Sequence, residues 1–386
     1  MTDIFAPAEL AGIMFQNRIL RSATMEDGAD EKGFPTEALA KKYLALAKGG
    51  VGGIITGFMG ISVEGKAQQP GMVLLDEDAK IRPLKDLTDA VHTAGVPIIA
   101  QIAHCGRNSV SGKKFDVNKM SDAELENIIT GFIAAAVRAQ KAGFDGVQVH
   151  FAHGYFLSEV LSPATNHRRD KWGGSEEKRF YMAERIITGI KKELPGYPIL
   201  VKMHGDDGVK NGVHADEAVR IAKRMELSGV SAIEVSRGLT VMNSMGPVYG
   251  RVPVEMILKV YPQMMGLPVF VKKVMKPMLP KMMKTVEPAP RRYNVDAAKK
   301  IKAAVHIPVI VVGGIHDLGE IEKTINDDGM DFVSMARPLV LEPGLVGKYK
   351  EGKADKAKCI ECNHCIIGIS TGNLKCWYGK VPESLK

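Results

Sequence analysis

The chain has 386 residues, of which 45% are hydrophobic and 25% are charged, and its formal net charge is +8. These proportions are average for globular proteins and exclude a disordered chain, a collagen-like chain and a disulfide-stapled miniprotein. Because the sequence has no signal peptide and no run near the ~18 apolar residues of a membrane span, we expect a cytoplasmic protein without a membrane span.

Short β-branched runs alternate along the chain with amphipathic stretches of helical length. The runs cover Arg18–Ser22, Gly53–Thr56, Pro97–Ile102, Gly146–His150, Pro198–Met203, Ala232–Ser236, Pro308–Val312 and Phe332–Met335. The stretches cover Thr36–Lys48, Ile81–Ala94, Asp122–Ala142, Glu177–Glu193, Ala215–Ser228, Val295–Val305 and Leu318–Asn326. This alternation is typical of βα units on a parallel sheet, so the sequence predicts an α/β fold, a (β/α)8 TIM barrel.

The interval after the sixth run is too long for an ordinary loop. It predicts an insertion at about residues 240–293 within a barrel domain of residues 1–352, and residues 353–386 form a separate C-terminal segment rich in cysteine. Within the insertion, the Met-rich stretch Met275–Met283 predicts a packed amphipathic helix.

The positive charge is concentrated at one place. Residues 272–302 hold ten Lys and Arg against two acidic residues, a surplus that equals the net charge of the whole chain. Loops that follow barrel strands open on the catalytic face, so we expect this segment to favour an anionic substrate such as an acyl-CoA. Docking to a second subunit is the alternative, whereas nucleic acid is not expected, because interleaved aromatic residues are missing.

Polar residues at the C-terminal ends of barrel strands are the candidates for catalysis. The fourth run leads into His150-Phe-Ala-His153-Gly-Tyr155. Two imidazoles can donate hydrogen bonds to an oxygen that gains negative charge, and a phenol can supply a proton. The seventh and eighth runs lead into Gly313-Gly314 and Ala336-Arg337, where TIM barrels commonly bind phosphate.

These motifs identify a resemblance to the old yellow enzyme family of FMN-dependent ene-reductases, from Phe5 to Gly352. The motifs that carry it are Asn17–Thr24, Gln101–Arg107, the long block His150–Gly174, and Val312–Gly314 with Ala336–Arg337. The resemblance implies that the isoalloxazine and phosphate of FMN are held by Ala23, Thr24, Gly57, Gln101, Lys202, Gly313, Gly314, Ala336 and Arg337. It also implies that His150 and His153 bind the substrate carbonyl and that Tyr155 is the proton donor.

Four of the five cysteines lie within the last 28 residues, as Cys359-x-x-Cys362-x-x-Cys365 followed after ten residues by Cys376. This spacing favours a [4Fe–4S] cluster, with a zinc site or unligated thiols as alternatives. It also resembles the subfamily that contains 2,4-dienoyl-CoA reductase and trimethylamine dehydrogenase. The fifth cysteine, Cys105, is interpreted as a small buried hydrophobe.

We therefore expect an FMN-dependent oxidoreductase that reduces C=C bonds conjugated to a carbonyl, in an enone or an enoyl-CoA. Its electrons come from NADH or NADPH, or through the cluster from a redox partner protein or subunit, and the chain is expected to form a homo-oligomer. Two alternatives are an electron-transfer subunit of a larger complex and an amine dehydrogenase. The second is disfavoured because an aromatic cage for a cationic amine is not evident.

Overall fold

The structure is a computed structural model that describes residues 1–239, 248–260, 262–283, 286–372 and 374–379. Eight parallel strands close into a barrel, because β3 pairs with both β4 and β11 and β4 also pairs with β6. The strands are β3 (Ile19–Arg21), β4 (Gly53–Ile55), β6 (Ile98–Ala103), β7 (Gly146–Phe151), β8 (Ile199–Asp206), β9 (Ala232–Arg237), β10 (Val309–Val312) and β11 (Phe332–Met335). The TIM barrel and its eight predicted strands are confirmed, and the two-residue β5 (Met59–Gly60) pairs with the end of β6.

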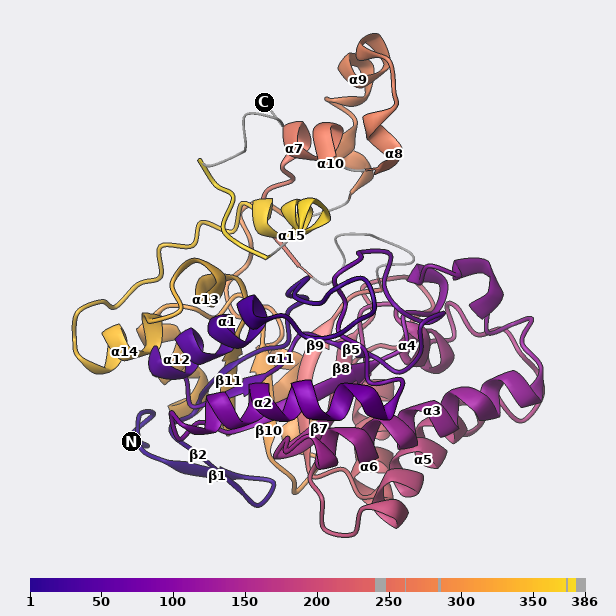
Figure 1. Ribbon diagram of the computed structural model, residues 1–386, viewed down its shortest axis with the longest axis horizontal. Helices are drawn as coiled ribbons and strands as arrows, with labels where there is room; N and C mark the ends of the chain where they lie inside the picture. The colour runs from indigo at the N-terminus through magenta and orange to yellow at the C-terminus, as the bar shows by residue number, and fades with distance from the viewer. Residues whose placement is uncertain (240–247, 261, 284–285, 373, 380–386) are drawn as a thin grey trace.

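Seven helices in the described residues match the predicted stretches and surround the barrel (Figure 1). They are α1 (Glu37–Lys48), α2 (Ile81–His92), α3 (Asp122–Lys141), α5 (Glu176–Glu193), α6 (Ala215–Ser228), α11 (Val295–Lys302) and α12 (Leu318–Asn326). The predicted start of α3 is also confirmed, because Ser121 and Glu124 form a reciprocal capping box there. Short helices follow some strands, namely α4 (Phe156–Leu161), α13 (Arg337–Leu341) and α14 (Leu345–Lys350).

The N-terminal end of the barrel is closed by an apolar plug. Strands β1 (Ala8–Leu10) and β2 (Ile13–Phe15) form an antiparallel hairpin. Leu10 and Phe15 of this hairpin pack in one cluster with inward residues of the barrel strands, such as Leu20, Leu200 and Phe332. Apolar burial at this end leaves the opposite, C-terminal end of the strands for polar groups.

The insertion forms short helices that lie beyond the C-terminal end of the barrel, beside the cysteine segment (Figure 1). They are α7 (Val254–Val260), α8 (Pro262–Met265), α9 (Val269–Met275) and α10 (Leu279–Met282), and α15 (His364–Gly368) belongs to the cysteine segment. Met256 and Ile257 of α7 pack with Ile367 and Trp377. The stretch Met275–Met283 is not one continuous helix, because α9 ends at Met275 and α10 covers only Leu279–Met282, but Leu279 packs with the residues of α7 as expected of a packed segment.

Acidic residues from several elements neutralise much of the basic segment. Lys276 pairs with Glu255, Arg291 with Asp317 and Glu320, Arg292 and Lys299 with Asp328, and Lys302 with Asp331. Five of the nine cations that the structure describes in this segment thus have carboxylate partners. Among the described residues, no helix combines the length and the apolar character that crossing a membrane requires.

Candidate active site

A cavity of about 410 Å³ opens at the C-terminal ends of the barrel strands. Most of the predicted site residues line it, from separate loops: Ala23, Thr24, Gln101, His150, His153, Tyr155, Lys202, Gly313, Gly314, Ala336, Arg337, Cys359 and Cys365. Gly57, Cys362 and Cys376 are not among its lining residues. A Cβ atom on Gly57 would lie 2.6 Å from the Thr24 carbonyl oxygen, so this glycine lets the loop that carries Thr24 approach closely. No described basic residue of the 272–302 segment lines the cavity.

Three rings at the end of β7 and in the turn after it gather at one side of the cavity. The ring centroid of His150 lies 5.0 Å from that of His153 and 5.2 Å from that of Tyr155. Phe58 packs against Tyr155 at 5.0 Å, which makes the wall behind the phenol apolar. The motif spacing predicts that the rings are close, and the turn after β7 brings His153 and Tyr155 back toward His150.

Both imidazoles are uncharged at neutral pH. Burial lowers the pKa of His150 well below 6.5, and the neighbouring Lys202 and His204 lower it further. Burial also lowers the pKa of His153, together with the effects of His150, Lys202 and His204. Nδ1 of His150 is buried and has no hydrogen-bond partner among the described residues. Each neutral imidazole still carries one N–H group, so each ring can donate a hydrogen bond to an oxygen anion.

A layer of polar side chains crosses the barrel below the cavity. The register of β7, β8 and β9 places Lys202 beside His150 on one side and Glu234 on the other. The Lys202 ammonium lies 3.2 Å from Glu234 Oε2 and donates to Ser22 Oγ at 2.9 Å. Glu234 Oε1 accepts hydrogen bonds from the hydroxyls of Ser22 and Ser334. The sequence analysis did not identify Glu234, although a charged residue inside the apolar run Ala-Ile-Glu-Val is a usable signal.

Gln148 connects this layer to the predicted cofactor residue Gln101. Its Nε2 donates to Glu234 Oε2 at 2.8 Å, and its Oε1 accepts from Gln101 Nε2 at 2.6 Å. Donating to Gln148 leaves the Gln101 side-chain oxygen as an acceptor at the cavity. The layer thus fixes the orientations of the amide and the ammonium group that face a ligand.

The loop after β10 has the shape of a phosphate cradle. Gly313 and Gly314 have φ of +121° and +65°, and a Cβ atom on them would lie 2.5 Å from Tyr293 and 2.6 Å from the Pro290 carbonyl oxygen. Only glycine adopts these φ values readily and leaves room for Tyr293 and Pro290 against the loop, so the backbone N–H groups stay open to the cavity that both glycines line. Together with the buried Lys202 and the Gln101 amide, this loop fits FMN.

Arg337 lines the cavity but also holds the cysteine segment. Its Nη1 donates to the carbonyl oxygen of Tyr249 at 2.8 Å and to Asn363 Oδ1 at 2.7 Å, while Nη2 pairs with Glu361 at 3.3 Å. Glu361 also lies 3.3 Å from Nε2 of His316. The resemblance assigns this guanidinium to the FMN phosphate, whereas its hydrogen bonds in the described residues go to Tyr249, Asn363 and Glu361, which motif spacing does not predict.

The four C-terminal cysteines fit a group larger than a single metal ion. Burial raises the pKa of the Cys365 thiol to about 12, and Cys359, Cys362 and Cys376 all lie within electrostatic range of it. Tetrahedral zinc, with Zn–S of about 2.3 Å, would bring the sulfur atoms to about 3.8 Å from one another. In the described part of the chain, no three of these sulfurs lie within 4.8 Å of one another. A cluster spaces its cysteine ligands more widely than zinc does, so these four thiols could hold an iron–sulfur cluster.

Cys105 is fully buried, and burial raises the pKa of its thiol well above the usual range. It packs with Phe58, Ala67, Met72 and Ala103 in one apolar cluster. Its interpretation as a small hydrophobe is confirmed.

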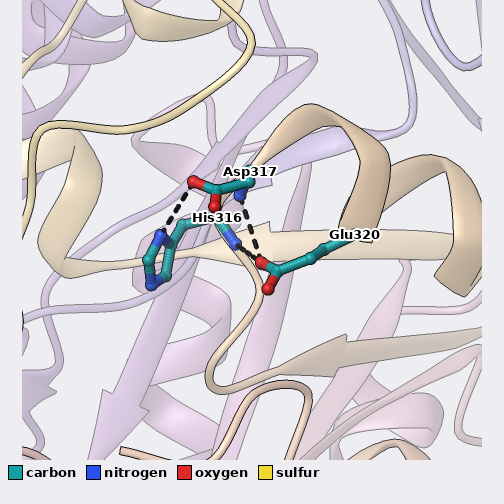
Figure 2. Close-up of side chains that lie close together, drawn as sticks. All are labelled: His316, Asp317 and Glu320. Carbon is teal, nitrogen blue, oxygen red and sulfur yellow. Dashed lines mark hydrogen bonds and ion pairs between the residues drawn. The ribbon is translucent and has the colours of Figure 1, made fainter. Parts of the chain in front are cut away.

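A second group of potential metal ligands lies at the start of α12 (Figure 2). His316, Asp317 and Glu320 approach one another, but Glu320 accepts the backbone N–H groups of the other two as part of a capping box. The Arg291 guanidinium contacts all three side chains. Because an arginine already supplies the positive charge, this cluster is a structural ion-pair network.

Comparisons with known proteins agree with this geometry. The family model described as "NADH:flavin oxidoreductase / NADH oxidase family" matches residues 3–249, and the dihydrouridine synthase model matches residues 285–370. The chain is similar to 4,4'-dithiodibutanoate disulfide reductase of Rhodococcus erythropolis, with 32% identity over 96% of this chain and 94% of that protein. It is 31% identical to NADH oxidase of Thermoanaerobacter brockii over 97% of this chain but only 55% of the relative.

Two solved structures share the fold. A 2-naphthoyl-CoA reductase superposes with a TM-score of 0.79 and 22% identity, over 97% of this chain and 56% of that one. An old yellow enzyme homologue of Zymomonas mobilis superposes with a TM-score of 0.72 and 22% identity, over 94% and 96% of the two chains. The chain thus spans about half the length of some proteins that it resembles and nearly the full length of others.

Proposed function

Because the chain belongs to the NADH:flavin oxidoreductase / NADH oxidase family, we propose that it reduces C=C bonds conjugated to a carbonyl, with FMN in the barrel cavity. The single observation that carries the proposal is the convergence of two neutral imidazoles and a phenol on the cavity that the glycine pair and Lys202 also line. When bound, FMN supplies the hydride.

The chain's own residues polarise the substrate and move the proton. His150 and His153 donate hydrogen bonds to the carbonyl oxygen, and these strengthen as that oxygen becomes an enolate. Tyr155 holds the proton that the α-carbon receives, at the apolar wall made by Phe58. Gly313, Gly314, Ala336 and Arg337 would hold the FMN phosphate, Ala23, Thr24, Gly57 and Gln101 would hold the edge of its ring, and Lys202 would stabilise negative charge on the ring.

Residues Cys359, Cys362, Cys365 and Cys376 hold a [4Fe–4S] cluster in this proposal. It would supply one-electron transfer between FMN and a partner protein, whereas NADH or NADPH would deliver hydride in the same cavity. The presence of Cys359 and Cys365 in the lining of the FMN cavity supports this arrangement.

The substrate class is proposed as an enone or an acyl-CoA thioester. A structural relative is named 2-naphthoyl-CoA reductase, and a conjugated thioester presents the same carbonyl oxygen to the imidazole pair. Since no described lysine of the basic segment lines the cavity, any attraction of the CoA phosphates by Lys272 and Lys273 acts outside the cavity and weakens with salt.

Anaerobic titration of the purified chain tests the proposal. We expect about one FMN and about four iron per chain, bleaching of the flavin by NADH or NADPH, and reoxidation by 2-cyclohexenone or an enoyl-CoA. Reoxidation by neither unsaturated compound would refute the proposed function. Adding a disulfide to the acceptor panel tests a second candidate, because the relative that is colinear with this chain over 94% of its length is named a disulfide reductase.

Amines as electron donors test the remaining alternative, amine dehydrogenase. A chain that transfers electrons from FMN to a protein acceptor, but reduces no small molecule, would be an electron-transfer subunit.

A further inference from the structure

Behind the imidazole pair lies a buried chain of three polar groups that the proposed mechanism does not use. The backbone N–H of His153 donates to Nε2 of His204 at 2.6 Å. Nδ1 of His204 lies 2.6 Å from Oδ1 of Asp207. Both side chains are nearly fully buried, at 4% and 2% exposed. Asp207 is itself fixed, because its Oδ2 accepts from the Ser162 hydroxyl and from the Val213 N–H.

His153, whose backbone N–H begins this series of hydrogen bonds, has an unusual backbone conformation. His153 has φ of +65°, in the left-handed region that residues with a side chain seldom adopt. This conformation directs its imidazole to Ser236, with Nε2 2.8 Å from the hydroxyl, and places it beside His150. A conformation that costs about 1 kcal/mol or more persists only where its surroundings hold it, and the hydrogen bond to His204 does so.

The hydrogen bonds fix the tautomer of His204. A backbone N–H can only donate, so Nε2 of His204 must be the acceptor and the proton must be on Nδ1, where it is donated to Asp207. If the proton moved to Nε2, two N–H groups would face each other at 2.6 Å. The Asp207 carboxylate prevents this because it can only accept.

We propose that Asp207 and His204 are positioning residues: Asp207 fixes the tautomer of His204, which holds the backbone of His153 so that its imidazole can bind the substrate oxygen. The inference rests on the proposed function for its effect on ligand binding. The link from Asp207 to the His153 backbone is independent of that function.

Asp207→Asn tests the inference, because the asparagine oxygen stays with Ser162 and Val213 and its NH2 then faces His204 Nδ1. The histidine proton moves to Nε2, and the His153 N–H loses its acceptor. Without this hydrogen bond the binding conformation of His153 must be restored when the ligand binds, so we expect about a ten- to hundred-fold loss of affinity for 4-hydroxybenzaldehyde, a phenol that imitates the enolate oxygen. FMN affinity, measured by flavin fluorescence, should be unchanged. Asp206→Asn is the control, since that carboxylate is half-exposed and pairs with His214.

His204→Gln supplies the second arm. Glutamine keeps an oxygen acceptor for the His153 N–H and has no tautomers, so the variant should lose less than about three-fold in phenol affinity. Asp207→Asn added to it should have no further effect. His204→Leu removes the acceptor and should lose at least ten-fold. Equal losses in the leucine and glutamine variants, or an undiminished effect of Asp207→Asn in the glutamine background, would overturn the proposal.

Selective 15N-histidine labelling separates this inference from the proposed function. We expect Nδ1–H for His204 in the unchanged chain, Nε2–H in Asp207→Asn, and a shifted backbone amide signal of His153 only in the latter. If the protein binds no phenol but the His204 proton still moves from Nδ1 to Nε2 in Asp207→Asn, the positioning role stands and the proposed substrate chemistry is refuted. Nε2–H in the unchanged chain overturns the positioning role whatever the phenol result.

Discussion

Replacing Glu234 by Gln should raise the reduction potential of the bound flavin and destabilise the fold. The Lys202 ammonium and the Glu234 carboxylate are 3.2 Å apart, and their side chains are 2% and 0% exposed. At an effective dielectric constant of about 20, their attraction is about 5 kcal/mol. Breaking a buried pair by removing one partner typically costs about 3–5 kcal/mol, so a loss of this size is expected in urea unfolding of the flavin-free chain.

Losing Glu234 leaves the Lys202 ammonium without its carboxylate partner. In the proposed complex this cation would then stabilise the reduced, negatively charged form of the flavin relative to the oxidised form. We expect the potential to rise by at least about 30 mV, the equivalent of about 1.4 kcal/mol for a two-electron couple. Dye-coupled anaerobic titration measures it, and Ser334→Ala, which removes a hydrogen bond to Glu234 but no charge, is the control. An unchanged or lower potential would show that Lys202 does not act on the flavin.

Three further predictions concern other parts of the site. Tyr155→Phe should slow enone reduction by about 10²–10⁴-fold while flavin reduction by NAD(P)H keeps its rate, as stopped-flow of the two half-reactions can show; equal slowing of both contradicts the proton-donor role. Cys362→Ser should lose iron and sulfide but keep FMN, and zinc in the unchanged protein after anaerobic purification would reject the cluster. Burial lowers the pKa of His104 to about 3, so the unfolded chain takes up a proton that the folded chain does not as pH falls below 6.5. That costs about 3 kcal/mol by pH 4.5, and His104→Gln should remove this part of the acid sensitivity in urea unfolding.

The barrel could be predicted because each strand and helix has a local signature. Runs such as Pro308–Val312 are short, β-branched and bounded by proline or glycine, and the helices between them carry caps such as Ser121. The register between neighbouring strands cannot be predicted from the sequence. Lys202 is visible as a lysine in a strand, but that Glu234 lies beside it depends on how β8 and β9 are aligned.

The pairing of the basic segment within the insertion could not be predicted for a related reason. Lysines that are adjacent in sequence form a patch only if no acidic residue from elsewhere meets them, and Asp328 and Asp331 follow α12 and lie more than 25 residues away from Arg292 and Lys299. Charge counts along a segment cannot include partners that folding brings to it. The Asp207–His204 pair was missed similarly, because only folding brings His204 of β8 to the His153 backbone and Asp207, just after β8, to His204.

In the proposed complex Arg337 would serve both the cysteine segment and the flavin phosphate. Its guanidinium binds the cysteine segment through Asn363 and Glu361, neither of which is a proposed ligand, and it also acts electrostatically on Cys359 and Cys365. If the cluster is lost and this loop loosens, the arginine is released toward the phosphate loop rather than removed from it. Release of a cation strengthens phosphate binding, and this is the physical reason to expect that FMN stays bound in Cys362→Ser. Conversely, Arg337→Ala should weaken both sites, because the same side chain serves both.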